Sequence, residues 1–267
     1  MRRLLVVAAI VIVAWLWPRA RVDHEPLRFA TFNIELFPQS ELQIVGAFEE
    51  IAKLDVGFVA VQEIGDAERF AREAKRRLGS RWELVLRGEP HGYYPGVLFD
   101  SSRWRLLSAR LHDETRLGAQ YLPTLEVRMR RGDSNLRVLV VHLKSGTPGR
   151  DVRKRQLRAL AEIIRDVARA NEPIVVLGDF NATEDGDRTD IAALARDNHL
   201  VWATEPLACT AFWRRSDGCP RSRLDHVLTW APPKTVAAAG ACASHGCGWE
   251  ESCPLYVSDH CPVVVTF

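Results

Sequence analysis

The sequence predicts a layered α/β fold in which mixed β-sheets are covered by helices. Short apolar runs alternate along the chain with amphipathic stretches of helical periodicity. Polar side chains stand at the ends of several apolar runs. With 267 residues and 47% hydrophobic content, the chain can bury a sizeable core. No internal repeat or low-complexity linker divides it, so we expect one domain over residues 23–267.

The expected strands are runs of apolar and β-branched residues, at positions 27–32, 56–61, 96–99, 124–129, 137–141, 174–177, 226–228 and 263–267. The expected helices span 41–53, 66–78, 151–170 and 189–197. In the third helix, Leu157, Leu160 and Ile164 recur at helical spacing, while arginine and lysine occupy the remaining faces. This pattern predicts a helix with one buried side.

Polar groups at the strand ends indicate a common site. Four early strands run directly into such groups, namely Asn33, Glu63, His142, and Asp179 with Asn181. Two late strands are instead preceded by them, namely by Asp225 and by the pair Asp259 and His260. If all these groups share one edge, the late strands must run opposite to the early ones, so the sheets are mixed. Such an edge is where active sites tend to be built.

Some residue types at this edge suit a metal ion. Glu63 and Asp259, with the amide oxygen of Asn33, are hard oxygen donors. Mg²⁺ binds such donors and completes its shell with water or substrate phosphate, and Mn²⁺ and Ca²⁺ accept the same ligand types. We therefore expect a divalent cation, Mg²⁺ before Mn²⁺ or Ca²⁺, at Asn33, Glu63 and Asp259.

The other groups suit proton transfer. His142 and His260 carry the side chains that titrate nearest neutral pH. Asp179 and Asp225 can each fix an imidazole tautomer or hold a water molecule. Metal, base, acid and orienting groups together match hydrolysis of a phosphate ester, in which charge on the phosphoryl group must be stabilised.

The chain resembles the endonuclease/exonuclease/phosphatase family through ordered motifs: TFNIE (31–35), VQE (61–63), VVHLKS (140–145), GDFNA (178–182), LDHVL (224–228) and SDHCPV (258–263). The resemblance extends over residues 27–267. It implies a four-layer sandwich, with two mixed β-sheets packed face to face and flanked by helices. It also implies divalent-metal-dependent phosphodiester or phosphomonoester cleavage.

The resemblance implies a role for each site residue. Glu63 matches the metal-binding acid, with Asn33 and Asp259 nearby. His142 and His260 match histidines that contact phosphate or transfer protons. Asp225 matches the carboxylate that orients the second histidine, and Asp179 with Asn181 matches the pair that positions the attacking water or contacts phosphate.

Within the family, the sequence looks most like the pancreatic-type deoxyribonuclease branch, in segments 27–37 and 258–267. His142 also favours secreted enzymes, because apurinic-site repair endonucleases usually carry Asn there. Members that cut duplex DNA place arginines where Gly65 and Tyr121 stand here. The stretch 91–99 lacks the acid that pairs with the first histidine in that branch. Either His142 has another partner or the chain belongs to a broader exported subgroup.

The first 22 residues are typical of an export signal. Two arginines precede an apolar run from Leu4 to Trp17, and further arginines follow Pro18. The run is shorter than the roughly 20 residues that span a bilayer, but the residues before Ala20 form a poor cleavage site. Residues 1–22 are therefore a cleaved signal peptide or a retained anchor. We expect a periplasmic or extracellular protein, attached to the membrane by residues 4–17 in the second case.

The cysteines agree with export. The chain has six, an even number, all between Cys209 and Cys261, which predicts disulfides. The alternative is a zinc site at CASHGC, with Cys242, His245 and Cys247 as ligands. That segment lacks the paired Cys-x-x-Cys spacing of zinc sites.

Net charge gives no strong pull toward a polyanion, since 36 basic residues nearly cancel 34 acidic ones. Two local clusters, at 149–158 and 213–225, are basic and could border the site. Trp213 could stack on an unpaired base.

The function predicted from the sequence is an exported, metal-dependent phosphodiesterase, with DNA or RNA as substrate and an endonuclease as the leading form. A sphingomyelinase-like enzyme acting on a lipid head group is the alternative within the enzyme class. From another class comes a catalytically silent binding protein on the same scaffold, which loss of a ligand or histidine would favour; no such loss is visible. No obligate protein partner is implied.

Overall fold

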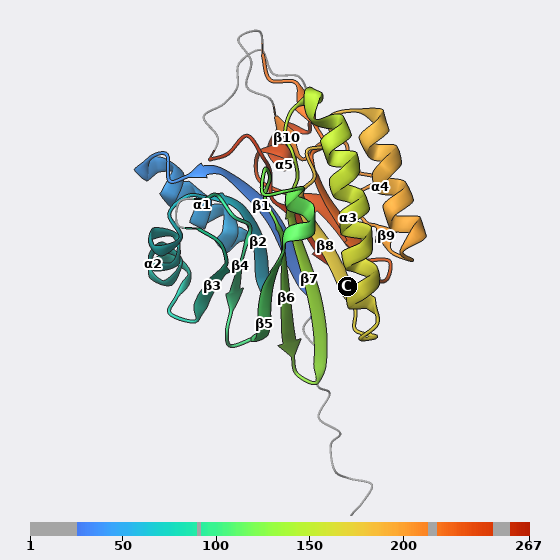
Figure 1. Ribbon diagram of the computed structural model, residues 1–267. Helices are drawn as coiled ribbons and strands as arrows, with labels where there is room; N and C mark the ends of the chain where they lie inside the picture. The colour runs from blue at the N-terminus through green and yellow to red at the C-terminus, as the bar shows by residue number, and fades with distance from the viewer. Residues whose placement is uncertain (1–25, 90–91, 213–217, 248–256) are drawn as a thin grey trace, which may run out of the picture.

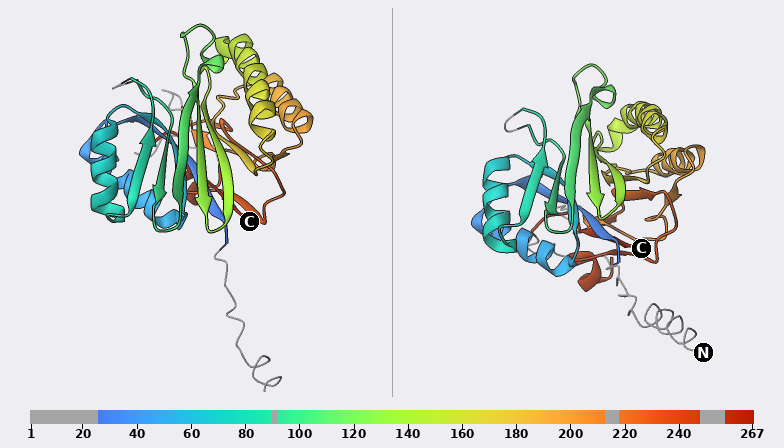
Figure 2. Two further views of the ribbon diagram at one scale, coloured as in Figure 1. Left: turned by 60° about the horizontal axis from the view of Figure 1, so that its bottom comes forward. Right: turned by 90° about the horizontal axis from the view of Figure 1, so that it is seen from below.

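Two mixed β-sheets packed face to face form the centre of the molecule. The computed structural model describes residues 26–89, 92–212, 218–247 and 257–267. Each of the large sheets has six strands. Helices α1 and α2 lie outside one sheet and α3 and α4 outside the other (Figure 1), and further views show the same four layers (Figure 2). The predicted four-layer sandwich is thus confirmed.

The first sheet has the order β13 (Thr235–Ala238), β14 (Val263–Thr266), β1 (Arg28–Phe37), β2 (Phe58–Ile64), β4 (Gly96–Asp100) and β3 (Trp82–Leu86). The second has the order β5 (Arg105–His112), β6 (Thr124–Arg131), β7 (Ser134–His142), β8 (Ile174–Asp179), β12 (Asp225–Thr229) and β9 (Val201–Trp202). A separate two-stranded sheet joins β10 (Ala211–Phe212) and β11 (Arg221–Ser222). The α-helices are α1 (Glu41–Leu54), α2 (Ala67–Leu78), α3 (Arg150–Ala168), α4 (Asp185–Asp197) and α5 (Ala241–His245). Short 3-10 helices are η2 (Asp113–Arg116) and η3 (Thr147–Gly149).

Three apolar layers hold the sandwich together. Between the sheets, Phe29 and Phe58 stack at 5.0 Å and belong to one buried cluster with Val127 and Val140 of the opposite sheet. A second cluster packs α1 and α2 on the first sheet, and a third packs α3 and α4 on the second. Because both faces of the central strands are buried, these strands are continuous apolar runs, as the sequence shows.

Strand directions bring the polar strand ends to one edge. β1 and β2 are parallel, as are β7 and β8. β12 is antiparallel to β8, and β14 is antiparallel to β1. The C-terminal ends of β1, β2, β7 and β8 therefore lie at the same edge as the N-terminal ends of β12 and β14. This confirms the mixed sheets that the polar residues predicted.

The predicted helices and apolar strands are all present. Helix starts agree with local signals, since Ser40 caps α1 and Asp66 caps α2 through side chains that accept a backbone N–H. The sequence did not predict the edge strands β3, β5, β9 and β13, or the small elements β10, β11 and α5. Within the described residues, no helix has the length and apolar character needed to cross a bilayer. The expected export segment, residues 1–22, lies outside the described residues.

Disulfides close the C-terminal region, as expected. Cys209 is bonded to Cys247, and Cys242 to Cys261. Cys219 is also disulfide-bonded, and Cys253 lies outside the described residues. The zinc alternative at CASHGC is excluded, because both of its cysteines are oxidised to disulfides.

Candidate active site

Three adjacent strands align three of the predicted site residues. His142, the last residue of β7, pairs with Asp179 of β8, and Asp179 pairs with Asp225 of β12. Paired residues of neighbouring strands point to the same face of a sheet, so these side chains form a row. The row faces Asn33 of the opposite sheet, whose amide nitrogen donates to Asp179 Oδ2 at 3.1 Å.

Glu63 joins this row from β2 through an unusual backbone. Its φ of 62° places it in the left-handed region, and β1 is irregular between Asn33 and Phe37. Its carboxylate accepts the Asn33 amide nitrogen at 3.1 Å and the Leu36 backbone N–H at 3.0 Å. Strain of this kind is common at functional sites. Here it directs a partly exposed carboxylate toward the row.

Asn33 presents its nitrogen, not its oxygen, to the carboxylates. The amide oxygen accepts the backbone N–H of Glu35 at 3.0 Å, which fixes the orientation of the buried amide. Its role as a direct metal ligand stays a prediction, whereas in this structure Asn33 orients Glu63 and Asp179.

Asp179 is fixed as a hydrogen-bond acceptor at the centre of the site. The backbone N–H of Asn181 donates to Oδ1 at 2.8 Å, and the Asn181 amide nitrogen donates to Oδ2 at 3.0 Å. That amide also donates to the Leu143 carbonyl oxygen at 3.0 Å, which ties the loop after β8 to the loop after β7. These hydrogen bonds fix the orientation of the Asp179 carboxylate.

Both histidines direct Nε2 at this one carboxylate. His142 Nε2 lies 3.6 Å from Asp179 Oδ2 and 3.6 Å from Glu63 Oε1, and His260 Nε2 lies 3.8 Å from the same Asp179 oxygen. His142 Nδ1 is buried and has no hydrogen-bond partner among the described residues. Segment 91–99 lacks the acid that would pair with His142. Among the described residues, no other carboxylate takes its place at Nδ1.

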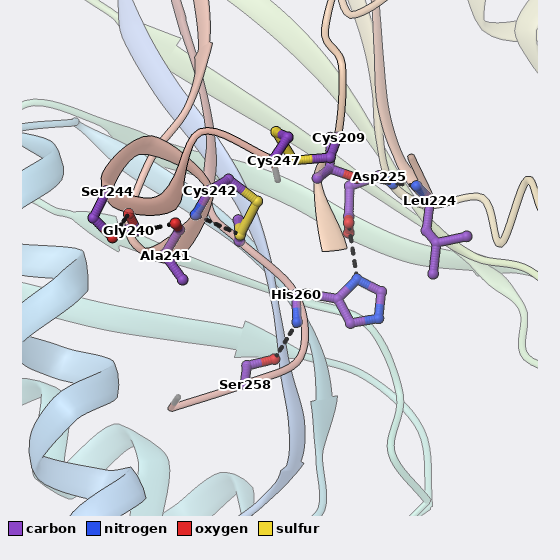
Figure 3. The surroundings of a disulfide bond; sticks show 12 residues. Cys209, Leu224, Asp225, Gly240, Ala241, Cys242, Ser244, Cys247, Ser258 and His260 are labelled. Atoms are coloured by element: carbon purple, nitrogen blue, oxygen red, sulfur yellow. Dashed lines mark hydrogen bonds and ion pairs between the residues drawn. A yellow bond between two sulfur atoms is a disulfide. The ribbon is translucent and has the colours of Figure 1, made fainter. Parts of the chain in front are cut away.

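Asp225 and His260 form a buried pair (Figure 3). The Nδ1–H of His260 donates to Asp225 Oδ2 at 2.8 Å, which leaves Nε2 facing the site. Burial raises the pKa of the Asp225 carboxyl, and the His260 imidazole opposes this effect. Burial also lowers the pKa of His260, but Asp225 and Asp179 outweigh it, so the pKa of His260 lies well above its ordinary value. The pair favours an imidazolium beside a carboxylate.

Ser258 fixes the segment that carries His260. Its hydroxyl donates to the Asn33 carbonyl oxygen at 2.8 Å and accepts the His260 backbone N–H at 3.0 Å. The backbone N–H of Asp259 donates to Glu35 Oε2 at 2.9 Å, and Asp259 Oδ1 lies 3.8 Å from His260 Nε2. Ser258 therefore links β1 to the end of the chain.

The donor set fits a divalent metal ion. Ligand atoms of Glu63, His142 and Asp179 all lie within 4.8 Å of one another, as do those of Asp179, Asp225 and His260. Glu63 has a carboxylate whose side chain is 20% exposed, so it can reach a solvated ion. Carboxylate oxygens beside a water-accessible opening are the ligands of Mg²⁺-type sites. The ion itself and its identity remain predictions.

Two buried side chains of α3 hold the loops behind the site. Arg153 donates to both carboxylate oxygens of Asp187, at 2.9 and 2.7 Å, and to the carbonyl oxygens of Lys144 and Gly146. Gln156 accepts the Lys144 backbone N–H at 2.9 Å. The basic cluster at 149–158 thus serves partly inside the protein, because Arg153 is fully buried and not available to a polyanion.

The structure brings together all the site residues predicted from the sequence: Asn33, Glu63, His142, Asp179, Asn181, Asp225, Asp259 and His260. It adds supporting residues that the sequence analysis did not assign, namely Ser258, Arg153 and Gln156. Arg153 and Gln156 lie on the polar side of an amphipathic helix, where a buried residue gives no distinct sequence signal. Trp213 lies outside the described residues, as does part of the basic cluster at 213–225.

Comparisons with known proteins agree with this architecture. The model of the Endonuclease/Exonuclease/phosphatase family matches residues 30–260. No curated protein matches the chain. Its fold is similar to humanized D. rerio TDP2 carrying 14 mutations, with a TM-score of 0.72 and 20% identity over 91% of this chain and 98% of that one. A structure of D. rerio TDP2 complexed with single strand DNA product has a TM-score of 0.73 and 18% identity over the same shares.

A human structure shows the same fold. The human Nocturnin catalytic domain with bound sulfate anion has a TM-score of 0.65 and 17% identity, over 90% of this chain and 93% of that one. These neighbours do not single out the pancreatic-type deoxyribonuclease branch, so that finer resemblance stays a prediction.

Proposed function

Because the chain belongs to the endonuclease/exonuclease/phosphatase family, we propose that it is an exported, divalent-metal-dependent phosphodiesterase that hydrolyses nucleic acid, as an endonuclease. One observation carries this proposal. Two imidazole Nε2 atoms, one at the end of β7 and one in the segment before β14, lie within 3.8 Å of the same oxygen of Asp179, with the Glu63 carboxylate beside them. Such an arrangement can present an acid, a base and a charge-neutralising group to one phosphodiester.

His260 and Asp179 are the proposed activators of water. Asp225 holds the His260 Nδ1 proton, so in neutral His260 the free Nε2 takes the proton of the attacking water, and Asp225 and Asp179 stabilise the imidazolium that forms. Asp179, fixed by Asn33 and Asn181, accepts a hydrogen bond from the water. This orients the lone pair of the water oxygen toward phosphorus. The new bond joins the water oxygen to phosphorus, and the bond between phosphorus and the leaving oxygen breaks.

His142 is the proposed partner of the phosphoryl or leaving oxygen. Its Nε2 lies 3.6 Å from Glu63 Oε1 and 3.6 Å from Asp179 Oδ2, so a protonated His142 can pair with either carboxylate. The imidazolium can donate to a phosphoryl oxygen or give its proton to the leaving oxygen, which takes the electron pair of the broken bond. Glu63, with Asp259 and Asn33 nearby, would hold the metal ion. When bound, the ion neutralises negative charge on the phosphoryl group.

Nucleic acid is the proposed substrate because the similar fold of D. rerio TDP2 was solved with single strand DNA product. At 18% identity this likeness carries the fold alone, so the substrate is our inference. Export is proposed from the N-terminal signal-like segment and is supported by the disulfides, which form in oxidising compartments. Membrane attachment through residues 4–17 remains the alternative to cleavage.

A lipid head group is the second candidate substrate, and one observation favours it. Among the described residues, the exposed large apolar side chains are Leu36, Leu42 and Tyr93. Leu36 donates its backbone N–H to Glu63, and the Tyr93 ring lies against Gly65, two residues after Glu63. An apolar rim beside the site suits an acyl chain as well as a base.

A paired assay separates the candidates. Supercoiled plasmid nicking and sphingomyelin hydrolysis are measured with Mg²⁺, with and without chelator, using the full chain and His260→Ala. The proposal predicts nicking that chelator abolishes and that His260→Ala lowers by about 10²-fold or more. Sphingomyelin hydrolysis without nicking would favour the lipid substrate, and no metal-dependent hydrolysis of either would contradict the proposed function.

A further inference from the structure

Two disulfides connect α5 to both members of the Asp225–His260 pair. Cys242, in α5, is bonded to Cys261, the residue after His260. Cys247, just beyond α5, is bonded to Cys209 (Figure 3), in the loop that precedes β10. The respective Cα separations are 5.9 and 5.7 Å. Residues 242–247 therefore form a covalent bridge between Cys209 and Cys261.

The segment after Cys209 contacts the start of β12, where Asp225 lies. Thr210 is fully buried, and its hydroxyl oxygen accepts the backbone N–H groups of Leu224 and Asp225 at 3.0 and 2.9 Å. Its carbonyl oxygen accepts the backbone N–H of Cys261 at 2.7 Å. Thr210 thus contacts the backbone at Asp225 and the backbone next to His260.

The same segment also pairs with the residues around His260. Ala211 forms an isolated antiparallel bridge with His260, and the backbone N–H of Phe212 donates to the Asp259 carbonyl oxygen at 2.7 Å. Residues 210–212 therefore connect the backbone at Asp225 to the backbone at His260.

Hydrogen bonds and disulfides hold this pairing, which has little apolar core of its own. β10 pairs with β11 in a two-stranded sheet that belongs to neither large sheet, and an isolated two-stranded sheet is marginal in water. The buried cluster beneath it consists of one phenylalanine and five cysteines, namely Cys209, Phe212, Cys219, Cys242, Cys247 and Cys261. The two large sheets, in contrast, have extensive apolar cores of their own.

We propose that the Cys209–Cys247 and Cys242–Cys261 disulfides position the Asp225–His260 pair by holding residues 209–212 against residues 259–261. The pair, and the hydrolysis that we assign to it, then requires oxidised cysteines, whereas the two large sheets do not. The expected effect on activity rests on the proposed function, whereas the expected effect on the geometry of the pair does not rest on it.

Reduction of the intact protein tests the proposal. Dithiothreitol donates two electrons and two protons to each disulfide, which becomes two thiols, and closes to its own cyclic disulfide. Proton NMR follows the His260 Nδ1–H, which resonates far downfield because it donates to a buried carboxylate. The signal is assigned by its absence in His260→Ala.

The His112–Glu126 pair provides an internal control. His112 Nε2 lies 2.8 Å from Glu126 Oε2, both groups are buried, and they belong to β5 and β6, away from the disulfides. We expect reduction to remove the His260 signal and keep the His112 signal and the far-ultraviolet circular dichroism. A retained His260 signal after a thiol count proves complete reduction would overturn the proposal. Loss of all structure would also overturn it, because the disulfides would then support the whole fold.

Variants separate positioning from general stability. Each disulfide is removed by a double change, Cys242→Ala with Cys261→Ala or Cys209→Ala with Cys247→Ala, and Ile164→Ala weakens the distant core under α3. We expect each disulfide variant to lower kcat by about 10²-fold, with KM changed much less, because small displacements of reacting groups have effects of that size. Ile164→Ala should lower Tm without affecting kcat or the His260 signal. Disulfide variants that behave like Ile164→Ala would contradict the positioning role.

The two readouts keep this proposal separate from the proposed function. If the oxidised protein hydrolyses no phosphodiester, the proposed function fails, while the NMR signals still decide whether the disulfides position the pair.

Discussion

The Nδ1 atom of His260 lies 2.8 Å from Oδ2 of Asp225, and both side chains are buried although they lie 35 residues apart in the sequence. The carboxylate fixes the imidazole tautomer, so that Nε2 faces Asp179 across 3.8 Å. The proton-transfer atom is therefore set by a residue that has no need to touch the substrate.

Asp225→Asn should reduce turnover while the fold is kept. An amide can donate to Nδ1 and stabilise the wrong tautomer, which removes the proton from the side where it is needed. We expect kcat to fall by about 10² to 10⁴, as measured by plasmid nicking with Mg²⁺. His112→Gln, which breaks a comparable histidine–carboxylate contact outside the site, on the face of the sheet that packs against α3, serves as the control and should leave kcat within about twofold. Equal effects of the two variants would argue against the orienting role.

Glu63→Gln should weaken metal binding. The replacement keeps the size of the side chain but removes the charge of the most exposed carboxylate in the Glu63, His142 and Asp179 group. We expect the Kd for Mn²⁺, measured by titration calorimetry or electron paramagnetic resonance, to rise by at least about 10-fold. Glu68→Gln changes an exposed carboxylate of α2 outside this group and should leave the Kd unchanged. An unaltered Kd in Glu63→Gln would exclude Glu63 as a ligand.

The sequence was enough to predict the edge on which the site is built. His142, Asp179 and Asp225 each stand at the end of an apolar run, and strand direction then places them in one row. It was not enough to predict how Asn33 is turned, because the amide orientation depends on the Glu35 N–H that the bend in β1 brings within 3.0 Å. Nor could it predict Thr210, whose role arises beside the short bridge between Ala211 and His260, which are 49 residues apart. Edge strands such as β5 were not predicted because their alternating exposure gives no continuous apolar run.

Arg153→Met should destabilise the protein strongly. Arg153 and Asp187 are both buried. Among the described residues, the change leaves Asp187 with only the longer ion-pair contact to Arg150, at 3.7 Å, and frees the carbonyl oxygens of Lys144 and Gly146. Breaking a buried pair from one side costs about 3 to 5 kcal/mol, measured as the free energy of unfolding in urea. The control, Arg76→Ala, removes a partly exposed pair with Glu73 and should cost less than about 1 kcal/mol. A similar small effect in Arg153→Met would show that the loops do not depend on this ion pair.

His226 should make the protein sensitive to mild acid. Burial, with Arg223 and Arg188 adding to it, lowers the pKa of His226 to about 3. The unfolded chain binds this proton below roughly pH 6.5 and the folded chain does not, so stability is lost as the pH falls from about 6.5 toward 3. The loss between pH 7 and pH 4 should be on the order of 3 kcal/mol, measured by urea unfolding at each pH.

His226→Phe should reduce that acid-dependent loss. The ring lies between Phe180 and Trp202, where an aromatic replacement can pack, and the Trp202 indole N–H keeps Thr204 Oγ1 as an acceptor at 3.1 Å. If the variant lost the same stability between pH 7 and pH 4 as the natural chain, other groups would be responsible for the acid sensitivity.

Gly178→Ala should disable the site through the backbone. Gly178 has φ of 139°, and a Cβ atom there would lie 2.1 Å from the Val141 carbonyl oxygen, so β7 and β8 could not approach in their present register. Gly79→Ala is the matched control, since Gly79 also has a positive φ, of 112°, but a Cβ atom would meet nothing within 4 Å. Both changes strain the backbone by about 1 to 3 kcal/mol. Only Gly178→Ala adds a collision next to His142 and Asp179, so we expect it alone to abolish nicking, with a lower Tm than Gly79→Ala. Equal Tm and equal activity in the two variants would mean that the close approach of β7 and β8 is not required to align the row.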